Sequence, residues 1–153
     1  MDLLKTAALL AALPGMAMAH VSVTPTSAVT GGYQLLRFGL GHGCQDIHAT
    51  TAIRIALPDG LGAARPQPKP GWTLKIEKGA IAWEGLLPPD QYEEFLILVR
   101  MPAAEGALAF PTTQSCGATV VRWDQPGGAN PAPRVTVTPT PPPAPNAGHD
   151  HQH

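Results

Sequence analysis

His20 carries the most specific chemical signal in the sequence. It directly follows Ala17-Met18-Ala19, a small-residue A-x-A pattern of the kind that signal peptidase cleaves. Cleavage there would leave His20 with a free α-amine beside its imidazole Nδ1, and these two nitrogens can close a chelate ring on one metal ion. Near-square coordination by nitrogen favours Cu(II) in the Irving–Williams order. We therefore expect His20 to be a copper ligand; the alternative is that it merely begins an edge strand.

A second ligating residue is expected, because two nitrogens alone rarely hold a metal tightly. His42 is the preferred candidate: its neighbours Gly41 and Gly43 leave room for close approach, and a disulfide at Cys44 could fix the loop. His48 lies between Ile47 and Ala49 and so lacks both the flanking glycines and a cysteine two residues later. The alternative for His42 is an ordinary surface histidine.

Three further histidines, His149, His151 and His153, form an H-x-H-x-H tract near the end of the chain. Such tracts bind Cu or Zn loosely, so we expect weak metal capture there and not the primary site. An expression tag is the alternative explanation for this tract.

Trp123 is the aromatic residue with a possible role at the metal. It follows Cys116 closely, so a disulfide between Cys116 and Cys44 would bring it towards the loop that carries His42. An indole face can stabilise and shield a soft cation. Core packing is the alternative for Trp123 and the default explanation for Trp72 and Trp83.

The first nineteen residues are expected to be a secretory signal. Lys5 is followed by an apolar run over residues 6–13, which is far shorter than the roughly 20 residues that a membrane span needs. No later stretch approaches that length, so we expect no membrane span in the mature chain. Export to the periplasm or the extracellular space would place the two cysteines in an oxidising compartment, where Cys44 and Cys116 have one possible pairing.

Length and composition predict one β-rich domain. The chain has 153 residues, and its 18 prolines and 16 glycines interrupt long helices but suit short strands joined by turns. The formal net charge of -1 gives no basic field for binding nucleic acid, so we expect no nucleic-acid partner.

Short segments of alternating apolar and polar residues recur about every ten residues, which is typical of a β-sandwich. The pattern predicts about nine strands, over residues 21–24, 33–40, 52–57, 72–78, 80–83, 94–101, 107–114, 119–124 and 134–138. We therefore expect an all-β, immunoglobulin-like antiparallel sandwich over residues 20–138. The Pro-rich residues 139–153 are expected to form a disordered tail.

Signals for catalysis are weak. The sequence contains no G-x-S-x-G, H-E-x-x-H, P-loop or dinucleotide fingerprint. Glu93 and Glu94 are adjacent, so on a strand they would point to opposite faces and could not act as a pair. We do not expect an enzyme.

Five segments, in order along the chain, together resemble the YcnI-like family of exported copper-binding domains. They are His20-Val21-Ser22-Val23, Gly41-His42-Gly43-Cys44, Ala49-Thr50-Thr51-Ala52-Ile53-Arg54-Ile55, Lys69-Pro70-Gly71-Trp72-Thr73-Leu74 and Phe110-Pro111-Thr112-Thr113-Gln114-Ser115-Cys116.

The resemblance implies a sandwich that binds Cu(II) through the amino-terminal histidine, with a tryptophan at the site and one further side-chain ligand. His20 matches the first ligand and Trp123 the tryptophan. Some members have a carboxylate where this chain has His42, which we therefore assign as the remaining ligand. Copper trafficking or homeostasis is the implied role, with a periplasmic copper chaperone or a copper importer as partner.

Two other functions remain open from the sequence. Copper held by the amine and imidazole of an amino-terminal histidine is called a histidine brace, and lytic polysaccharide monooxygenases carry such a brace on a β-sandwich. About 119 folded residues, however, leave little surface for an extended substrate. A metal-free interaction module is the other alternative, because the fold alone does not dictate the function.

Overall fold

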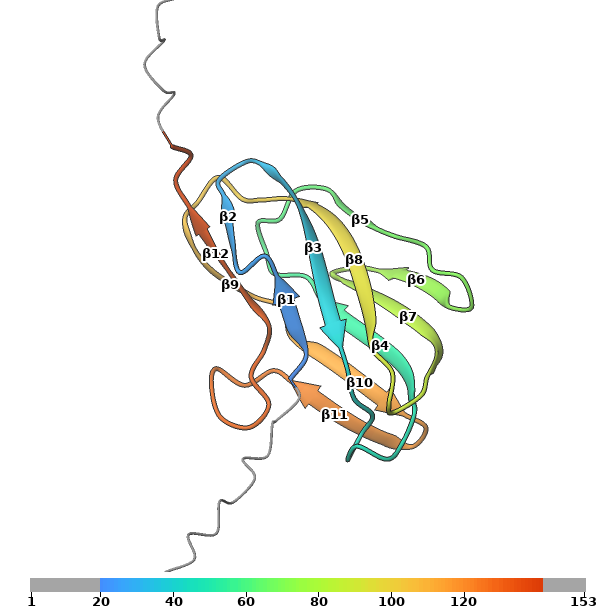
Figure 1. Ribbon diagram of the computed structural model, residues 1–153. Helices are drawn as coiled ribbons and strands as arrows, with labels where there is room; N and C mark the ends of the chain where they lie inside the picture. The colour runs from blue at the N-terminus through green and yellow to red at the C-terminus, as the bar shows by residue number, and fades with distance from the viewer. Residues whose placement is uncertain (1–19, 142–153) are drawn as a thin grey trace, which may run out of the picture.

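Strands with period-two alternation form the framework of the protein. A computed structural model describes residues 20–141, which form twelve strands in three sheets (Figure 1). The expected signal segment, most of the expected tail and the three histidines at the end of the chain lie outside the described residues. No helix of residues 20–141 is long and apolar enough to span a membrane.

The first sheet has four strands, and its neighbours pair antiparallel. Their order is β1 (Ser22–Thr24), β3 (Tyr33–Leu40), β8 (Glu93–Arg100) and β5 (Ala64–Pro66). Because β1 and β3 are antiparallel, with Ser22 opposite Gly39, the start of β1 lies beside the end of β3.

The second sheet has five strands, also antiparallel, and it forms the other layer of the sandwich (Figure 1). Their order is β11 (Thr119–Trp123), β10 (Thr112–Cys116), β4 (Thr50–Ala56), β7 (Ala80–Leu87) and β6 (Thr73–Glu77). Strand β11 is therefore an edge strand, and Trp123 is its last residue.

A small third sheet joins segments that are far apart in the sequence. It contains β2 (Ser27–Val29), β12 (Arg134–Thr138) and β9 (Gly106–Ala109). Strands β12 and β2 pair in parallel, a local exception to the expected antiparallel arrangement.

The core lies between the two large sheets and is built from inward-facing residues of both. Phe95 is fully buried and contacts Trp83 and Trp72, with ring centroids 5.3 and 5.0 Å away. The indole of Trp83 donates a hydrogen bond to the Gln67 carbonyl. The packing role expected for Trp72 and Trp83 is therefore confirmed.

Three details of the strand prediction were wrong. The expected strand 80–83 is only the first half of β7, which continues to Leu87. The expected strand 107–114 is divided into β9 and β10, which belong to different sheets. Pro111 lies between them and has no N–H to continue a ladder. The short strands β2 and β5 were not predicted, because each forms by pairing with a strand that is distant in the sequence, β12 and β8 respectively.

Candidate metal centre

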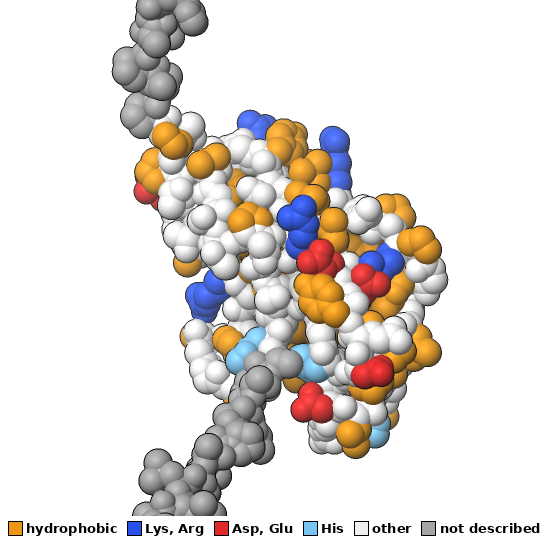
Figure 2. All heavy atoms as spheres, viewed as in Figure 1, with side chains coloured by type: hydrophobic (Ala, Val, Ile, Leu, Met, Phe, Trp, Pro, Cys, Tyr) orange, Lys and Arg blue, Asp and Glu red, His pale blue; other side chains and the backbone are white. Residues whose placement is uncertain are grey.

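The candidate centre lies at the end of the sandwich where β1 begins and where β3 and β11 end (Figure 1). His20 precedes β1 by two residues, His42 follows β3 by two residues, and Trp123 ends β11. Figure 2 shows histidine side chains at this end of the molecule.

Trp123 contacts both histidines through its aromatic ring. Its ring centroid lies 5.9 Å from that of His20 and 5.5 Å from that of His42, and both pairs meet edge to face. His42 and Trp123 are buried, with 8% and 4% exposure, whereas His20 is exposed. The fold therefore brings together the three residues that were expected to form the site.

The imidazole of His42 is held in one tautomer with a lone pair available for binding. Its Nδ1 lies 2.9 Å from the carbonyl oxygen of Gly43, and since a carbonyl can only accept, Nδ1 carries the proton. In the neutral imidazole, Nε2 is then the nitrogen without a proton, and it is buried without a hydrogen-bond partner among the described residues. A buried acceptor left unpaired is costly, and a metal-binding histidine commonly has its other nitrogen bonded to a backbone carbonyl in this way. The donor atom of His42 fits a metal ligand.

Within residues 20–141, no three His, Cys, Asp or Glu side chains are grouped so that they could hold a metal ion. Side chains alone thus supply two imidazoles, one from His20 and one from His42. A third nitrogen would have to come from the backbone, and the α-amine that cleavage before His20 would release is a suitable donor.

The disulfide between Cys44 and Cys116 is confirmed and fixes the segment that carries His42. The two Cα atoms are 5.9 Å apart, and the backbone N–H of Cys44 donates to Sγ of Cys116 over 3.1 Å. A disulfide of this kind indicates an oxidising, extracytoplasmic compartment.

A tight turn follows this disulfide. The N–H of Cys44 bonds to the carbonyl of His48 and the N–H of His48 to the carbonyl of Cys44, at 3.1 and 3.2 Å. Gln45 and Asp46 within the turn both have positive φ. His48 is exposed and held by this turn, whereas His42 is buried and contacts Trp123.

Sequence reasoning missed one residue of the site, Gln114 on β10. Its side chain is completely buried and makes three hydrogen bonds, to the His42 carbonyl, to Thr50 Oγ1 and to the Trp123 indole. A signal was present, because Gln114 is two residues from Cys116 on a strand and therefore shares its inward face.

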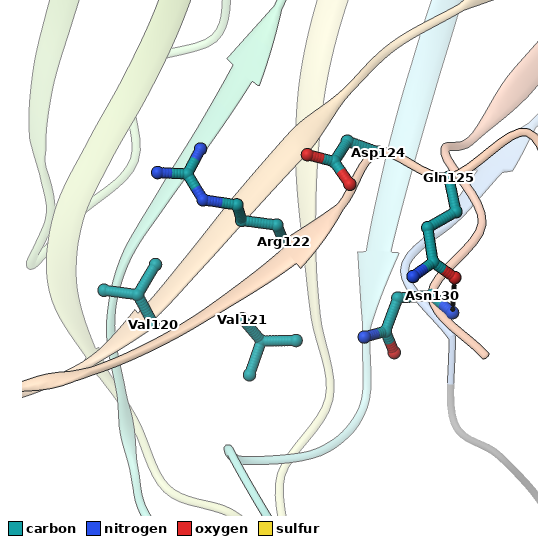
Figure 3. A pocket seen from close by; sticks show the side chains of 6 residues that line it. All are labelled: Val120, Val121, Arg122, Asp124, Gln125 and Asn130. Carbon is teal, nitrogen blue, oxygen red and sulfur yellow. Dashed lines mark hydrogen bonds between the residues drawn. The ribbon is translucent and has the colours of Figure 1, made fainter.

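A separate hollow lies beside the edge strand β11 (Figure 3). Its wall includes a hydrogen bond of 3.1 Å from the Asn130 N–H to Gln125 Oε1. It is lined by Val120, Val121, Arg122, Asp124, Gln125 and Asn130. Neither histidine nor Trp123 is among these residues, so the hollow is distinct from the candidate metal centre.

Comparison with solved structures identifies the fold. The crystal structure of an uncharacterized protein from Nocardia farcinica, described as having an immunoglobulin-like fold, is 28% identical, with a TM-score of 0.69 over 78% of this chain and 98% of that chain. The predicted immunoglobulin-like fold is thus confirmed. The seventh ScaB type I cohesin from Pseudobacteroides cellulosolvens is 12% identical over 88% of this chain and 97% of its own, with a TM-score of 0.49.

No curated protein matches the chain. A family model described as "Domain of unknown function (DUF1775)" matches residues 20–82 and 79–144, which together make up most of the sequence. The protein therefore belongs to the DUF1775 family.

Proposed function

We propose that the protein is an exported copper-binding protein of the YcnI-like kind, and that it carries Cu(II) in copper trafficking or homeostasis. The ion would be held by the α-amine and Nδ1 of a mature amino-terminal His20 and by Nε2 of His42. The observation that carries the proposal is that Nε2 of His42, beside Trp123, is buried and has no hydrogen-bond partner within residues 20–141.

The chemistry of the donors supports copper. Two imidazoles and an amine make an all-nitrogen set, which is typical of Cu(II). The hydrogen bond from His42 Nδ1 to the Gly43 carbonyl sets the ring orientation before the ion arrives, so little ordering remains to be done on binding.

Trp123 supports a carrier in preference to an enzyme. Its buried ring meets both imidazoles edge to face. A bulky side chain in this position limits the approach of oxygen and of an extended substrate to the bound ion. We therefore propose binding without turnover.

Export is the second part of the proposal. The disulfide supports an oxidising compartment, and removal of residues 1–19 there would produce the amine that the site needs. We place the mature protein in the periplasm or outside the cell. His149, His151 and His153 would capture copper weakly, and a periplasmic chaperone or a copper importer would exchange the ion with the centre.

Calorimetric titration with Cu(II) of mature protein that begins at His20 tests the proposal. We expect one tightly bound equivalent, which the His42→Ala variant loses. The matched control is His48→Ala, which removes an exposed imidazole from the adjacent turn and should leave tight binding unchanged. Equal affinities for wild type and His42→Ala would exclude His42 as a ligand.

A further inference from the structure

Gln114 is a fully buried amide that connects the two segments carrying His42 and Trp123. Its Nε2 donates to the His42 carbonyl over 3.0 Å, and its Oε1 accepts from the Trp123 indole N–H over 3.2 Å. A buried amide is costly unless it is hydrogen-bonded, so these bonds hold both neighbours against it.

The orientation of this amide is fixed by the chemistry of its partners. An indole nitrogen can only donate, so the oxygen of Gln114 must face Trp123. The amide nitrogen then faces two acceptors, the His42 carbonyl and Thr50 Oγ1, the latter at 2.8 Å. Reversing the amide would break the bonds to the Trp123 indole and to the His42 carbonyl.

The network continues from Gln114 to the disulfide. Cys116 Sγ has no proton, so the Thr50 hydroxyl, at 3.8 Å, is the donor in their contact. The same sulfur accepts from the Cys44 N–H. Gln114 thus lies between the disulfide, which anchors the His42 segment, and the indole that contacts His42.

We propose, on the basis of the copper function proposed above, that Gln114 is a positioning residue of the metal centre. Its amide sets the orientation of the Trp123 indole and the position of the His42 backbone, and so determines how the His42 imidazole is presented. Gln114 itself is bonded on both ends of its amide and acts through these two neighbours.

Loss of the Gln114 amide would change this part of the protein before any metal binds. Without the amide, the buried indole N–H and the His42 carbonyl would each lose a partner, and both groups would shift to find another. Trp123 would then move relative to the His42 ring. Loss of an outer hydrogen-bond partner of a metal ligand typically lowers metal affinity by about 10- to 100-fold.

The test compares Gln114→Met with Thr112→Val in mature protein. Methionine keeps the length of the side chain but removes every hydrogen bond. Thr112 is the matched control because it is also buried and inward on β10 and lies opposite Trp123 in the ladder. Its hydroxyl bonds to the Phe110 carbonyl, and valine removes that bond while keeping the shape of the side chain.

The first readout uses metal-free protein and NMR. In Gln114→Met we expect faster hydrogen exchange of the Trp123 indole N–H, assigned with a Trp123→Phe variant, and a changed His42 ring signal. The second readout is the Cu(II) electron paramagnetic resonance spectrum together with the affinity. We expect an altered spectrum and about 10- to 100-fold weaker binding, neither of which Thr112→Val should show.

The outcomes separate the two proposals. Tight copper binding by wild type with unchanged NMR signals, spectrum and affinity in Gln114→Met overturns the role of Gln114 alone. Absence of tight binding by wild type overturns the copper function and, with it, this role at a metal centre. If Gln114→Met does not fold, Gln114→Glu is used, which keeps an acceptor for the Trp123 indole but loses the amide donors. This variant should retain the protection of the indole N–H from exchange and change the copper spectrum. An unchanged copper spectrum would overturn the positioning role of Gln114.

Discussion

Replacing both Cys44 and Cys116 with alanine should destabilise the protein strongly, because the disulfide joins two segments that are distant in the sequence. The cysteines are separated by 72 residues, and both are buried where the His42 segment meets β10. The native fold already places their Cα atoms 5.9 Å apart, so the main effect of the bond is on the denatured chain.

The size of the effect follows from the length of the closed loop. In the chain-entropy description, a loop closed over this separation removes about 15 cal/mol/K from the denatured state, which corresponds to about 4 kcal/mol at room temperature. A domain of this size is typically stable by only about 5–15 kcal/mol, so a loss of about 4 kcal/mol removes between about a quarter and about four-fifths of its stability.

Urea unfolding of the metal-free mature protein, followed by tryptophan fluorescence, measures this loss. Omitting copper ensures that a change in ligand binding does not contribute to the difference. Wild-type protein with its disulfide reduced is the matched control, since it lacks the bond but keeps both sulfur atoms. We expect both forms to lose a similar free energy of unfolding. A loss below about 1 kcal/mol in both would refute the argument that loop closure stabilises this fold.

Three further predictions concern the core, the His42 segment and Tyr92. Phe95→Ala should lower the free energy of unfolding by about 3–5 kcal/mol, measured in urea, because the ring is fully buried between two tryptophans. Gly43→Ala should destabilise the protein and weaken copper binding in a titration, because its Cβ would collide with the carbonyl of the adjacent turn; Gly127→Ala meets no atom within 4 Å and should change neither. Burial and the hydrogen bond to Glu94 raise the pKa of Tyr92 above 10.0, so in a phenolate absorbance titration Glu94→Gln should move this pKa downward, and an unchanged value would exclude the interaction.

Strong alternation allowed the long strands to be predicted from the sequence. The segments 33–40 and 134–138 have the predicted bounds in the structure. The short β2 was missed because its pairing depends on β12, which lies more than 100 residues later and is not a local feature. The division at Pro111 could have been predicted, since a proline inside a strand pattern indicates an interruption.

The site could be predicted in outline but not in its hydrogen bonding. A single possible cysteine pairing was enough to bring His42 and Trp123 to one end of the sandwich. The free lone pair on His42 Nε2 depends on the bond between Nδ1 and the Gly43 carbonyl, which is a matter of ring orientation and not of sequence. Gln114 was overlooked because glutamine is an uncommon copper ligand, although the alternation with Cys116 placed it on the inward face.

The central claim is that one residue, His20, supplies both an amine and an imidazole to Cu(II). The most direct measurement is a pair of copper titrations on two chains that both begin at His20, one with a free α-amine and one with that amine acetylated. Acetylation turns the α-amine of His20 into an amide, which is a poor ligand, and leaves every side chain in place. We expect one tightly bound equivalent for the chain with the free amine and loss of that tight site in the acetylated chain; equal affinity in the two chains would contradict the claim.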